Sequence, residues 1–206
     1  MSITISKVSL WDRIEEDPLA DLNSVLELFL KHHPKDGTEL IKKAHKKAQS
    51  AHSGQIRKSG DAYITHPVAV AEIVASLGLD EATIIAALLH DTLEDTGEAL
   101  EGIKEQFGQE VATIVDGVTK LDRIKFDTKE AQQAASMRKM LVAVAKDLRV
   151  LLIKLGDRLH NMRTIASLPK WKQQRIATET LDIYAPLAHR LGMQGLKNEL
   201  EDLAFA

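Results

Sequence analysis

The sequence predicts an all-helical fold, and three observations lead to that prediction. Residues with high helix propensity dominate, whereas glycine and proline are sparse, at 11 and 5 of 206 residues. Aromatic residues make up only 4% of the chain, so alanine, leucine, isoleucine and valine must form the core. Apolar residues recur along most of the chain at the spacing of one helix face. A chain of this length forms one large domain or two small ones.

Composition and charge exclude several kinds of protein. The chain has no cysteine, which rules out disulfides, zinc–thiolate sites and cysteine nucleophiles. Its net charge of −3 does not predict nucleic-acid binding, although it leaves room for a local basic pocket. The first residues lack the basic start and apolar run of a secretory signal. The apolar stretches are too short to span a bilayer, so we expect a cytoplasmic protein.

The first two predicted helices are followed by a loop. Residues 17–33 carry apolar side chains at helical spacing and predict an amphipathic helix. Residues 38–52 continue this pattern, with Thr38 as the expected N-cap. The segment SGQIRKSGDAYI, residues 53–64, is mostly polar and contains two glycines, so we expect a loop there.

Glycine and proline mark the boundaries of the next helices. Residues 66–78 have proline at the first expected helical position and end in glycine. Asp80 is expected to cap one continuous helix over residues 81–96. Residues 98–108 and 109–124 predict two further helices, the first of which ends in glycine.

The second half of the chain begins with a polar segment, residues 125–135, which we expect to form a loop. The remaining helices are predicted at residues 136–147, 148–165, 169–192 and 196–206. The run VLLIKL is also compatible with a buried strand, but no second strand candidate lies nearby to pair with it. Pro186 should kink the helix that contains it.

The segment HDTLEDT, residues 90–96, places four ionisable side chains directly after the apolar run ATIIAALL. They are His90, Asp91, Glu94 and Asp95. Each helical residue turns about 100°, so all four lie along one wall of a continuous helix. Three crowded carboxylates stay ionised only beside a cation or in contact with water. A divalent metal meets the first condition, and a solvent-exposed acidic helix end meets the second.

Two other segments favour the metal. The motif YITHP puts His66 at a junction between loop and helix, and Asp157 follows an apolar run that should be buried. A buried carboxylate is costly unless it is paired or bound to metal, and without a metal Asp157 would pair with Arg158 or Arg163. Two histidines and two aspartates without thiolates suit manganese, iron or zinc. These residues therefore predict a metal-dependent hydrolase.

Several ordered motifs together resemble the HD superfamily of metal-dependent phosphohydrolases. They resemble more closely the hydrolase domain of RelA/SpoT homologues, the bacterial alarmone enzymes. The motifs are RKSGDAYITHP, AALLHDTLEDT, VDGVTKLDRI, RVLLIKLGDRLHNMRT and YAPLAHRLGM. The resemblance runs from about Ala44 to the end of the chain.

This resemblance implies that residues 1–206 form an all-α HD-domain bundle of about ten helices around a single metal site. It implies removal of pyrophosphate from the 3′ position of ppGpp and pppGpp, which leaves GDP or GTP. It also implies a manganese ion, Mn2+, bound by His66, His90, Asp91 and Asp157.

The resemblance also assigns roles around the metal. In the family the ED pair of this motif, here Glu94 and Asp95, is associated with hydrolysis. Because the pair lies one turn beyond two of the ligands, we expect it to orient and deprotonate the attacking water. The substrate-binding positions that the resemblance implies are Arg57, Lys58 and Ser59 of the RKSG loop, together with Asn161 and Thr164. Gly156 departs from the family, which often has alanine there, and a glycine could loosen the helix that carries Asp157. His160 is expected to face away from Asp157 and receives no role.

For the whole protein, the resemblance implies an N-terminal fragment of a longer bifunctional enzyme with synthetase and regulatory domains beyond residue 206. Those domains would make any contact with the ribosome, whereas this chain is expected to bind neither membrane nor nucleic acid directly. A small stand-alone alarmone hydrolase is the alternative.

Two other functions fit part of the pattern. An HD phosphohydrolase for a different nucleotide would keep the metal ligands but would have no reason to carry the RKSG loop. A non-catalytic sensor would bind the nucleotide without turnover, and the intact pair Glu94 and Asp95 argues against it.

Overall fold

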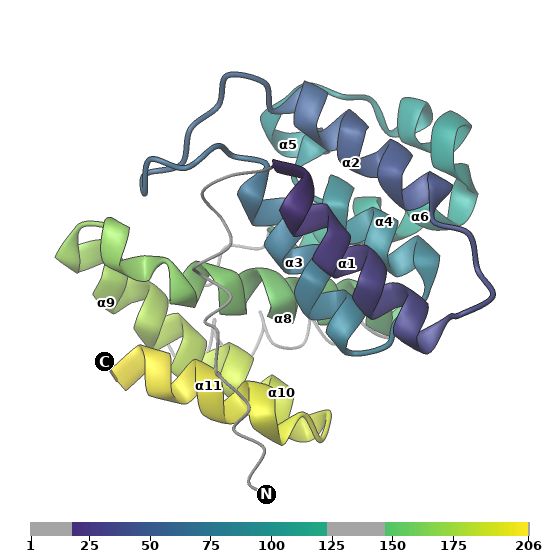
Figure 1. Cartoon of the computed structure of the whole chain (residues 1–206). Coiled ribbons are helices and arrows are strands. Elements are labelled where there is room, and N and C mark those ends of the chain that lie inside the picture. The colour runs from purple at the N-terminus through teal and green to yellow at the C-terminus, as the bar shows by residue number, and fades with distance from the viewer. Residues whose placement is uncertain (1–17, 123–146, 206) are drawn as a thin grey trace, which may run out of the picture.

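The computed structural model describes residues 18–122 and 147–205, and their regular structure is helical (Figure 1). The helices are α1 (Pro18–His32), α2 (Glu39–Ala51), α3 (Thr65–Ser76), α4 (Glu81–Leu89), α5 (Thr92–Asp95), α6 (Leu100–Asp122), α8 (Leu148–Arg163), α9 (Lys170–Glu179), α10 (Ala185–Arg190) and α11 (Gln194–Phe205). Within these ranges the strand-like pairing is limited to one antiparallel bridge between Ile56 and Ala62. The all-α prediction is therefore confirmed. The predicted loop at 125–135 and nearly all of the predicted helix at 136–147 lie outside the described residues.

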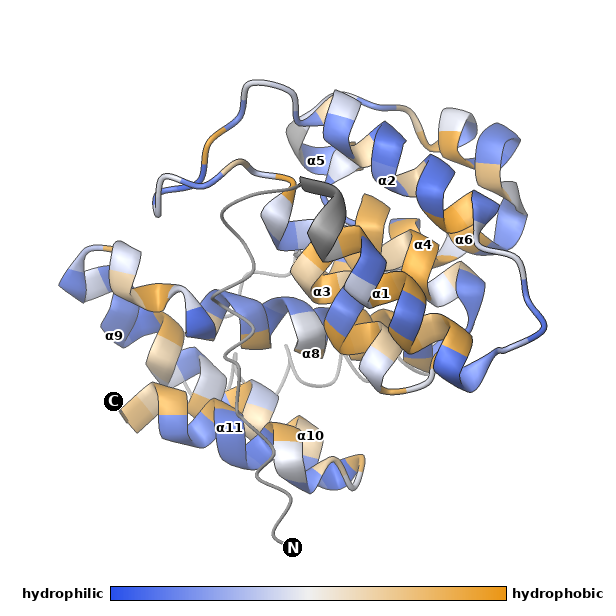
Figure 2. Ribbon diagram, in the orientation of Figure 1, coloured by the Kyte–Doolittle hydropathy of each residue, from blue (hydrophilic) through white to orange (hydrophobic). Residues whose placement is uncertain are grey.

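Helix α8 occupies the middle of the fold (Figure 1). It packs against α3 and α6 on one side and against α11 on the other. Helix α3 also contacts α1 and α4, and most of its residues are apolar (Figure 2). In α4 every residue from Thr83 to Leu89 is buried, which explains why its sequence is apolar on all sides. The segments that carry the predicted ligands thus lie in the interior.

Of three predicted helix starts, one agrees with the structure and two differ in detail. Asp80 caps α4 as predicted, because its Oδ1 accepts a hydrogen bond from the backbone N–H of Thr83 at 2.9 Å. Thr38 occupies the N-cap position of α2, but its side chain makes no capping hydrogen bond. Helix α3 begins at Thr65, so Pro67 is its third residue rather than its first.

The prediction of one continuous helix over residues 81–96 is wrong. Helix α4 ends at Leu89, a turn follows at residues 90–91, and the short helix α5 begins at Thr92. The Nδ1–H of His90 donates to the carbonyl of Ala87 at 2.7 Å, and the Thr92 hydroxyl donates to the carbonyl of Leu89 at 2.7 Å. These side chains compete for carbonyls that would otherwise accept bonds within the helix, and the helix breaks here.

The predicted break at Gly108 is present. Helix α6 is interrupted at Gly108, whose φ of 90° is the left-handed conformation that glycine adopts most easily. Residues Thr180–Tyr184 form a π-helical turn, η3, between α9 and α10, directly before the N-terminal turn of α10 that contains Pro186. A short 3-10 turn, η2 (Ile165–Ser167), follows α8.

The described residues contain no helix that is long and apolar enough to cross a membrane.

Candidate metal centre and nucleotide pocket

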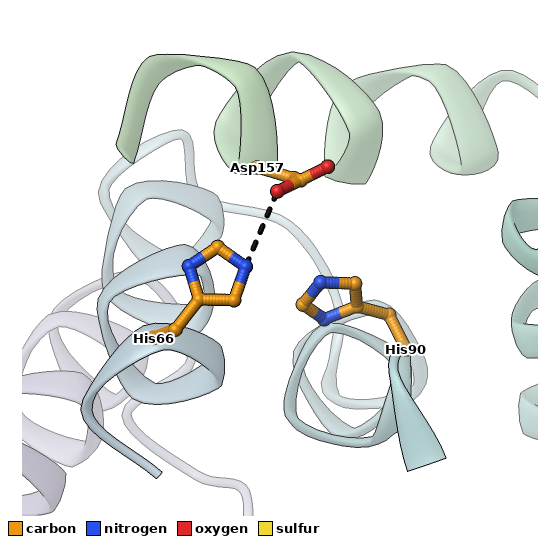
Figure 3. A group of neighbouring side chains, drawn as sticks. All are labelled: His66, His90 and Asp157. Carbon is orange, nitrogen blue, oxygen red and sulfur yellow. Dashed lines mark ion pairs between the residues drawn. The ribbon is translucent and has the colours of Figure 1, made fainter. Parts of the chain in front are cut away.

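Three helices bring the strongest ligand candidates together. His66 is the second residue of α3, His90 follows α4 directly, and Asp157 lies in α8. One ligand atom from each lies within 4.8 Å of the others, and the side chains point toward one another (Figure 3). All three are nearly inaccessible, with exposed fractions of 3%, 1% and 5%. Segments far apart in sequence thus form one buried cluster of nitrogen and oxygen donors.

Asp91 completes the predicted set of four. Its Oδ1 lies 3.0 Å from Nε2 of His90, and its Oδ2 lies 3.7 Å from Nε2 of His66. The hydroxyl of Tyr63 donates to Asp91 Oδ2 at 2.8 Å and so fixes the carboxylate. Asp157 approaches from the other side, with its Oδ1 at 3.2 Å from Nε2 of His66 (Figure 3). The structure therefore brings all four predicted ligands together.

The hydrogen bonding of His90 fits a metal ligand. Its Nδ1–H donates to the backbone carbonyl of Ala87, which can only accept, so in the neutral ring the other nitrogen carries the lone pair. That atom, Nε2, is buried and has no hydrogen-bond partner although it lies beside Asp91. An imidazole held in this way by its second nitrogen is the usual arrangement of a metal-bound histidine. The group could therefore hold a divalent metal.

The carboxylate of Asp157 stays ionised in spite of its burial. Burial raises its pKa, but the ammonium group of Lys154 and then the ring of His66 hold the pKa well below the usual value. Arg158 and Arg163 were the expected partners of Asp157, and that expectation is wrong. Asp157 pairs with Lys154 instead. Arg158 pairs with Glu179, and Arg163 pairs with Glu199. Lys154 lies three residues before Asp157 on the same helix, a spacing that brings the two side chains together.

The two histidines have opposite pKa shifts. Burial lowers the pKa of His66 more than the neighbouring carboxylates raise it. Burial also opposes the charged form of His90, but Asp91 and then Asp157 outweigh it and raise its pKa. The pKa of Asp91 is lowered, because His90 and His66 outweigh the effect of burial. The centre is thus a compact set of coupled charges that a cation would compensate.

His160 corrects the sequence analysis. It is buried, and its Nδ1 lies only 2.7 Å from Nδ1 of His66, so it does not face away from the site. Three residues along a helix correspond to about 300°, which leaves His160 only about 60° from Asp157. Burial, followed by the charges of His66 and Arg57, lowers the pKa of His160 to about 3. This ring is therefore neutral at physiological pH.

A pocket of ≈ 660 Å³ opens beside the cluster. Its lining includes five basic side chains from the loop after α2 and from α8 and α9, which are Arg57, Lys58, Lys154, Arg158 and Arg175. Its lining also includes four carboxylates, which are Asp91, Glu94, Asp157 and Glu179. The volume is that of a site for a small organic molecule, and the basic side chains favour an anionic one.

Most predicted substrate residues lie at this pocket. Arg57, Lys58, Asn161 and Thr164 line it, and so does the predicted catalytic residue Glu94. Ser59 does not line it, because its hydroxyl donates to Asp61 at 2.6 Å at the exposed tip of the loop. Asp95 belongs to α5, but its side chain lies outside the described part of the structure.

A hydrogen-bonded chain joins the loop to the metal cluster. The Nη2 of Arg57 donates to Asn161 Oδ1 at 3.1 Å, and Nδ2 of Asn161 donates to Asp157 Oδ1 at 2.6 Å. Both oxygen and nitrogen of the Asn161 amide are therefore engaged within the protein. Asn161 orients a candidate metal ligand and a candidate substrate residue at once.

Sequence reasoning missed several side chains at the site. Tyr63 and Lys154 lie close in sequence to predicted ligands, so their helix and loop positions offered a signal. Arg175 and Glu179 come from α9, and no local pattern connects them with the metal motifs.

Known proteins resemble this chain over most of its length. A family model for the HD domain matches residues 44–194. A GTP pyrophosphokinase of Streptomyces coelicolor is 58% identical over 89% of this chain and 22% of its own length. A guanosine-3′,5′-bis(diphosphate) 3′-pyrophosphohydrolase of Haemophilus influenzae is 60% identical over 77% of this chain and 23% of its own. The bifunctional (p)ppGpp synthase/hydrolase SpoT of Escherichia coli is 51% identical over 89% and 26%.

The chain therefore spans about a quarter of the length of these curated relatives. A solved structure described as a metazoan ortholog of SpoT that hydrolyzes ppGpp has a similar fold, with a TM-score of 0.61 and 26% identity. The similarity covers 82% of this chain and 96% of that one. The matched span and the relatives together show that the chain belongs to the HD domain family, as its motifs predicted.

Proposed function

We propose that this chain hydrolyses the 3′-pyrophosphate of ppGpp and pppGpp with Mn2+ as its metal, in the cytoplasm. The observation that carries the proposal is the buried cluster of His66, His90 and Asp157 at one side of a nucleotide-sized pocket whose lining includes five basic side chains. Relatives named as 3′-pyrophosphohydrolases, at 51–60% identity, support this substrate class. The products are GDP or GTP and intact pyrophosphate.

The ligands of the ion are His66, His90, Asp91 and Asp157. When bound, a divalent metal neutralises phosphate charge and makes a water molecule more acidic. The chain's own contribution is to hold these donors in fixed positions. Tyr63 and Asn161 orient the two carboxylates by hydrogen bonds, and the carbonyl of Ala87 orients His90.

Glu94 and Asp95 serve the proton transfer. Glu94 lines the pocket and lies one turn after the ligand pair, so its carboxylate can accept a proton from the attacking water. The water oxygen then forms a bond to the phosphorus attached to the 3′ oxygen. The bond between that phosphorus and the 3′ oxygen breaks, and the 3′ oxygen takes up a proton.

The loop after α2 holds the nucleoside end of the substrate. Arg57 has a planar guanidinium group that can stack on guanine, and the ammonium group of Lys58 can meet a phosphate. The amide of Asn161 is already bonded to both Arg57 and Asp157. We therefore propose that Asn161 orients Arg57 and Asp157 rather than contacting the substrate. Thr164 is proposed to lie beside the bound nucleotide. Ser59 acts indirectly, because it holds the tip of the loop through Asp61.

The test is to incubate the purified chain with ppGpp and Mn2+ and to separate the products by anion-exchange chromatography. We expect GDP and pyrophosphate in equal amounts, and no turnover when a chelator replaces the metal. Arg57→Ala should raise KM more than it lowers kcat, because a stacking contact is present in both ground and transition states.

Other products would contradict the proposal. Orthophosphate as the first product, or equal rates on GTP, which has no 3′-pyrophosphate, would indicate a phosphohydrolase for other nucleotides. Tight binding of ppGpp without turnover at any metal concentration would indicate a sensor.

A further inference from the structure

His160 contacts a metal-ligand candidate without belonging to the ligand set. It lies in α8, it is 7% exposed, and its Nδ1 is 2.7 Å from Nδ1 of His66. The two ring centroids are 4.9 Å apart. At this separation one nitrogen must carry the hydrogen and the other must accept it. The pair therefore has a defined donor and a defined acceptor in each of its tautomers.

His90 shows which arrangement a ligand histidine requires here. Its Nδ1–H is bound by the Ala87 carbonyl, so its Nε2 presents a lone pair to the cluster. The Nε2 of His66 faces the same cluster, 3.2 Å from Asp157 Oδ1. To present a lone pair there, His66 must carry its hydrogen on Nδ1. The atom that faces Nδ1 must then accept, and that atom is Nδ1 of His160.

We propose that His160 is a positioning residue for metal binding, which accepts a hydrogen bond from Nδ1–H of His66 and so directs the Nε2 lone pair of His66 into the cluster. His160 plays the part for His66 that the Ala87 carbonyl plays for His90. Its own hydrogen is then on Nε2. This inference rests on the proposed metal site but not on the identity of the substrate.

Two substitutions separate the hydrogen bond from the bulk of the ring. The side-chain oxygen of asparagine stands as many bonds from Cα as Nδ1 of histidine does, so His160→Asn keeps an acceptor in place. His160→Leu introduces an apolar side chain of comparable size and removes the hydrogen-bond acceptor. Mn2+ affinity is measured by titration calorimetry on metal-free protein without substrate, and the melting temperature of each metal-free variant controls for folding.

We expect His160→Leu to weaken Mn2+ binding by roughly 10–100-fold, the range for lost partners of metal-bound side chains. His160→Asn should restore most of the affinity. In wild-type protein loaded with diamagnetic Zn2+, the ¹⁵N chemical shifts of His66 should show the hydrogen on Nδ1. This measurement reads the tautomer directly and needs no variant.

Wild-type Mn2+ affinity in the leucine variant would overturn the inference. So would equal weakening by asparagine and leucine, because the ring's bulk would then matter rather than the acceptor. A hydrogen on Nε2 of His66 in the loaded protein would overturn it as well. The same measurements separate this inference from the proposed function. If Mn2+ binding depends on His160 but the protein does not hydrolyse ppGpp, the proposed substrate is wrong and this inference still holds.

Discussion

Glu94 is proposed to assist the metal-bound reaction without being a metal ligand. It is exposed in α5 and lines the pocket that His66 and Asp157 also line. Glu94→Gln keeps the shape of the side chain and removes its ability to take a proton. We expect unchanged Mn2+ affinity and a kcat lower by roughly 10²–10⁴-fold, the usual contribution of a general base. Calorimetry and initial rates at saturating ppGpp measure the two quantities.

Two variants serve as controls for Glu94→Gln. Asp91→Ala should lose Mn2+ affinity as well as activity, because it removes a ligand. Glu101→Gln makes the same chemical change on the exposed first turn of α6, where Glu101 pairs only loosely with Lys104 at 3.8 Å, and it should change neither quantity. Wild-type turnover in Glu94→Gln would refute the assigned role.

The neutral state of His160 makes the metal-free protein sensitive to acid. The pKa of His160 is about 3 in the folded state, against 6.5 for a free histidine. Between these two pH values, His160 is protonated in the unfolded chain but not in the folded chain. Stability is therefore lost as pH falls from 6.5 toward 3, by at most about 1.4 kcal/mol per pH unit for this one proton. Urea unfolding in chelator between pH 7.5 and 5 should show a steeper loss in wild type than in His160→Asn. Parallel curves would show that another group is responsible.

The clustering of the proposed ligands was predictable because each is a polar residue at the start or end of an apolar run, and because family motifs surround them. The contact of His160 with the cluster was predictable as well, since its angle of about 60° to Asp157 places both side chains on one side of α8. Lys154 was overlooked in favour of Arg158 and Arg163 as partners of Asp157. Arg175 could not be predicted, because only the packing of α9 near α8 brings it to the pocket.

Among the helices, α8 makes two glycine-containing contacts, one through a glycine on α8 itself and one through a glycine on α6, that can be tested by adding one methyl group. At Gly156 a Cβ would lie 3.5 Å from Ile73 Cγ2 and 3.6 Å from Val70 Cγ1, which is ordinary contact. Gly156→Ala should therefore raise the free energy of unfolding by about 1 kcal/mol, the difference in helix propensity. Glycine here does not reflect a lack of room in the contact between α3 and α8.

Gly117 in α6 is the matched control for Gly156. A Cβ there would lie 2.6 Å from Val150 Cγ2 on α8, and a valine cannot turn aside easily. Gly117→Ala should lower the free energy of unfolding, because overpacking of about 1–3 kcal/mol outweighs the gain in helix propensity. Denaturant unfolding of both variants measures the difference. A loss of stability in Gly156→Ala would mean that the two helices cannot adjust even to ordinary contact.

Helix boundaries were predictable where the known preference of a single residue sets them, and less so where several side chains compete for backbone carbonyls. Asp80 at the start of α4 and Gly108 within α6 act through their own capping or dihedral preferences. The break after Leu89 depends on hydrogen bonds from His90 and Thr92 to the carbonyls of the preceding turn. An apolar pattern contains no information on that competition, so the sequence suggested one helix where there are two.

For the molecule as a whole, the proposed metal would join α3, the end of α4 and α8. Arg158 extends the link from α8 toward the C-terminal helices, because it pairs with Glu179 at 3.1 Å and lies 4.1 Å from the centroid of the Tyr184 ring. The cluster is also where like charges meet, since the partly buried Asp91 and the buried Asp157 both lie beside His66. A cation at this point would therefore hold the three helices together and reduce the repulsion between the two carboxylates.

Metal binding should accordingly raise the stability of the whole folded chain. A ligand that binds only the folded state adds about 1.4 kcal/mol for each tenfold rise in its free concentration above Kd. We expect the melting temperature to rise steadily with Mn2+ and to fall to its lowest value in chelator.

His90→Ala should make the melting temperature independent of Mn2+, because it removes a buried ligand. His189→Ala removes a histidine of α10 that bonds Gln194 instead, and it should keep the full dependence. A wild-type melting temperature that is equal in chelator and in Mn2+, or a dependence that survives in His90→Ala, would show that the ion does not bind at this cluster.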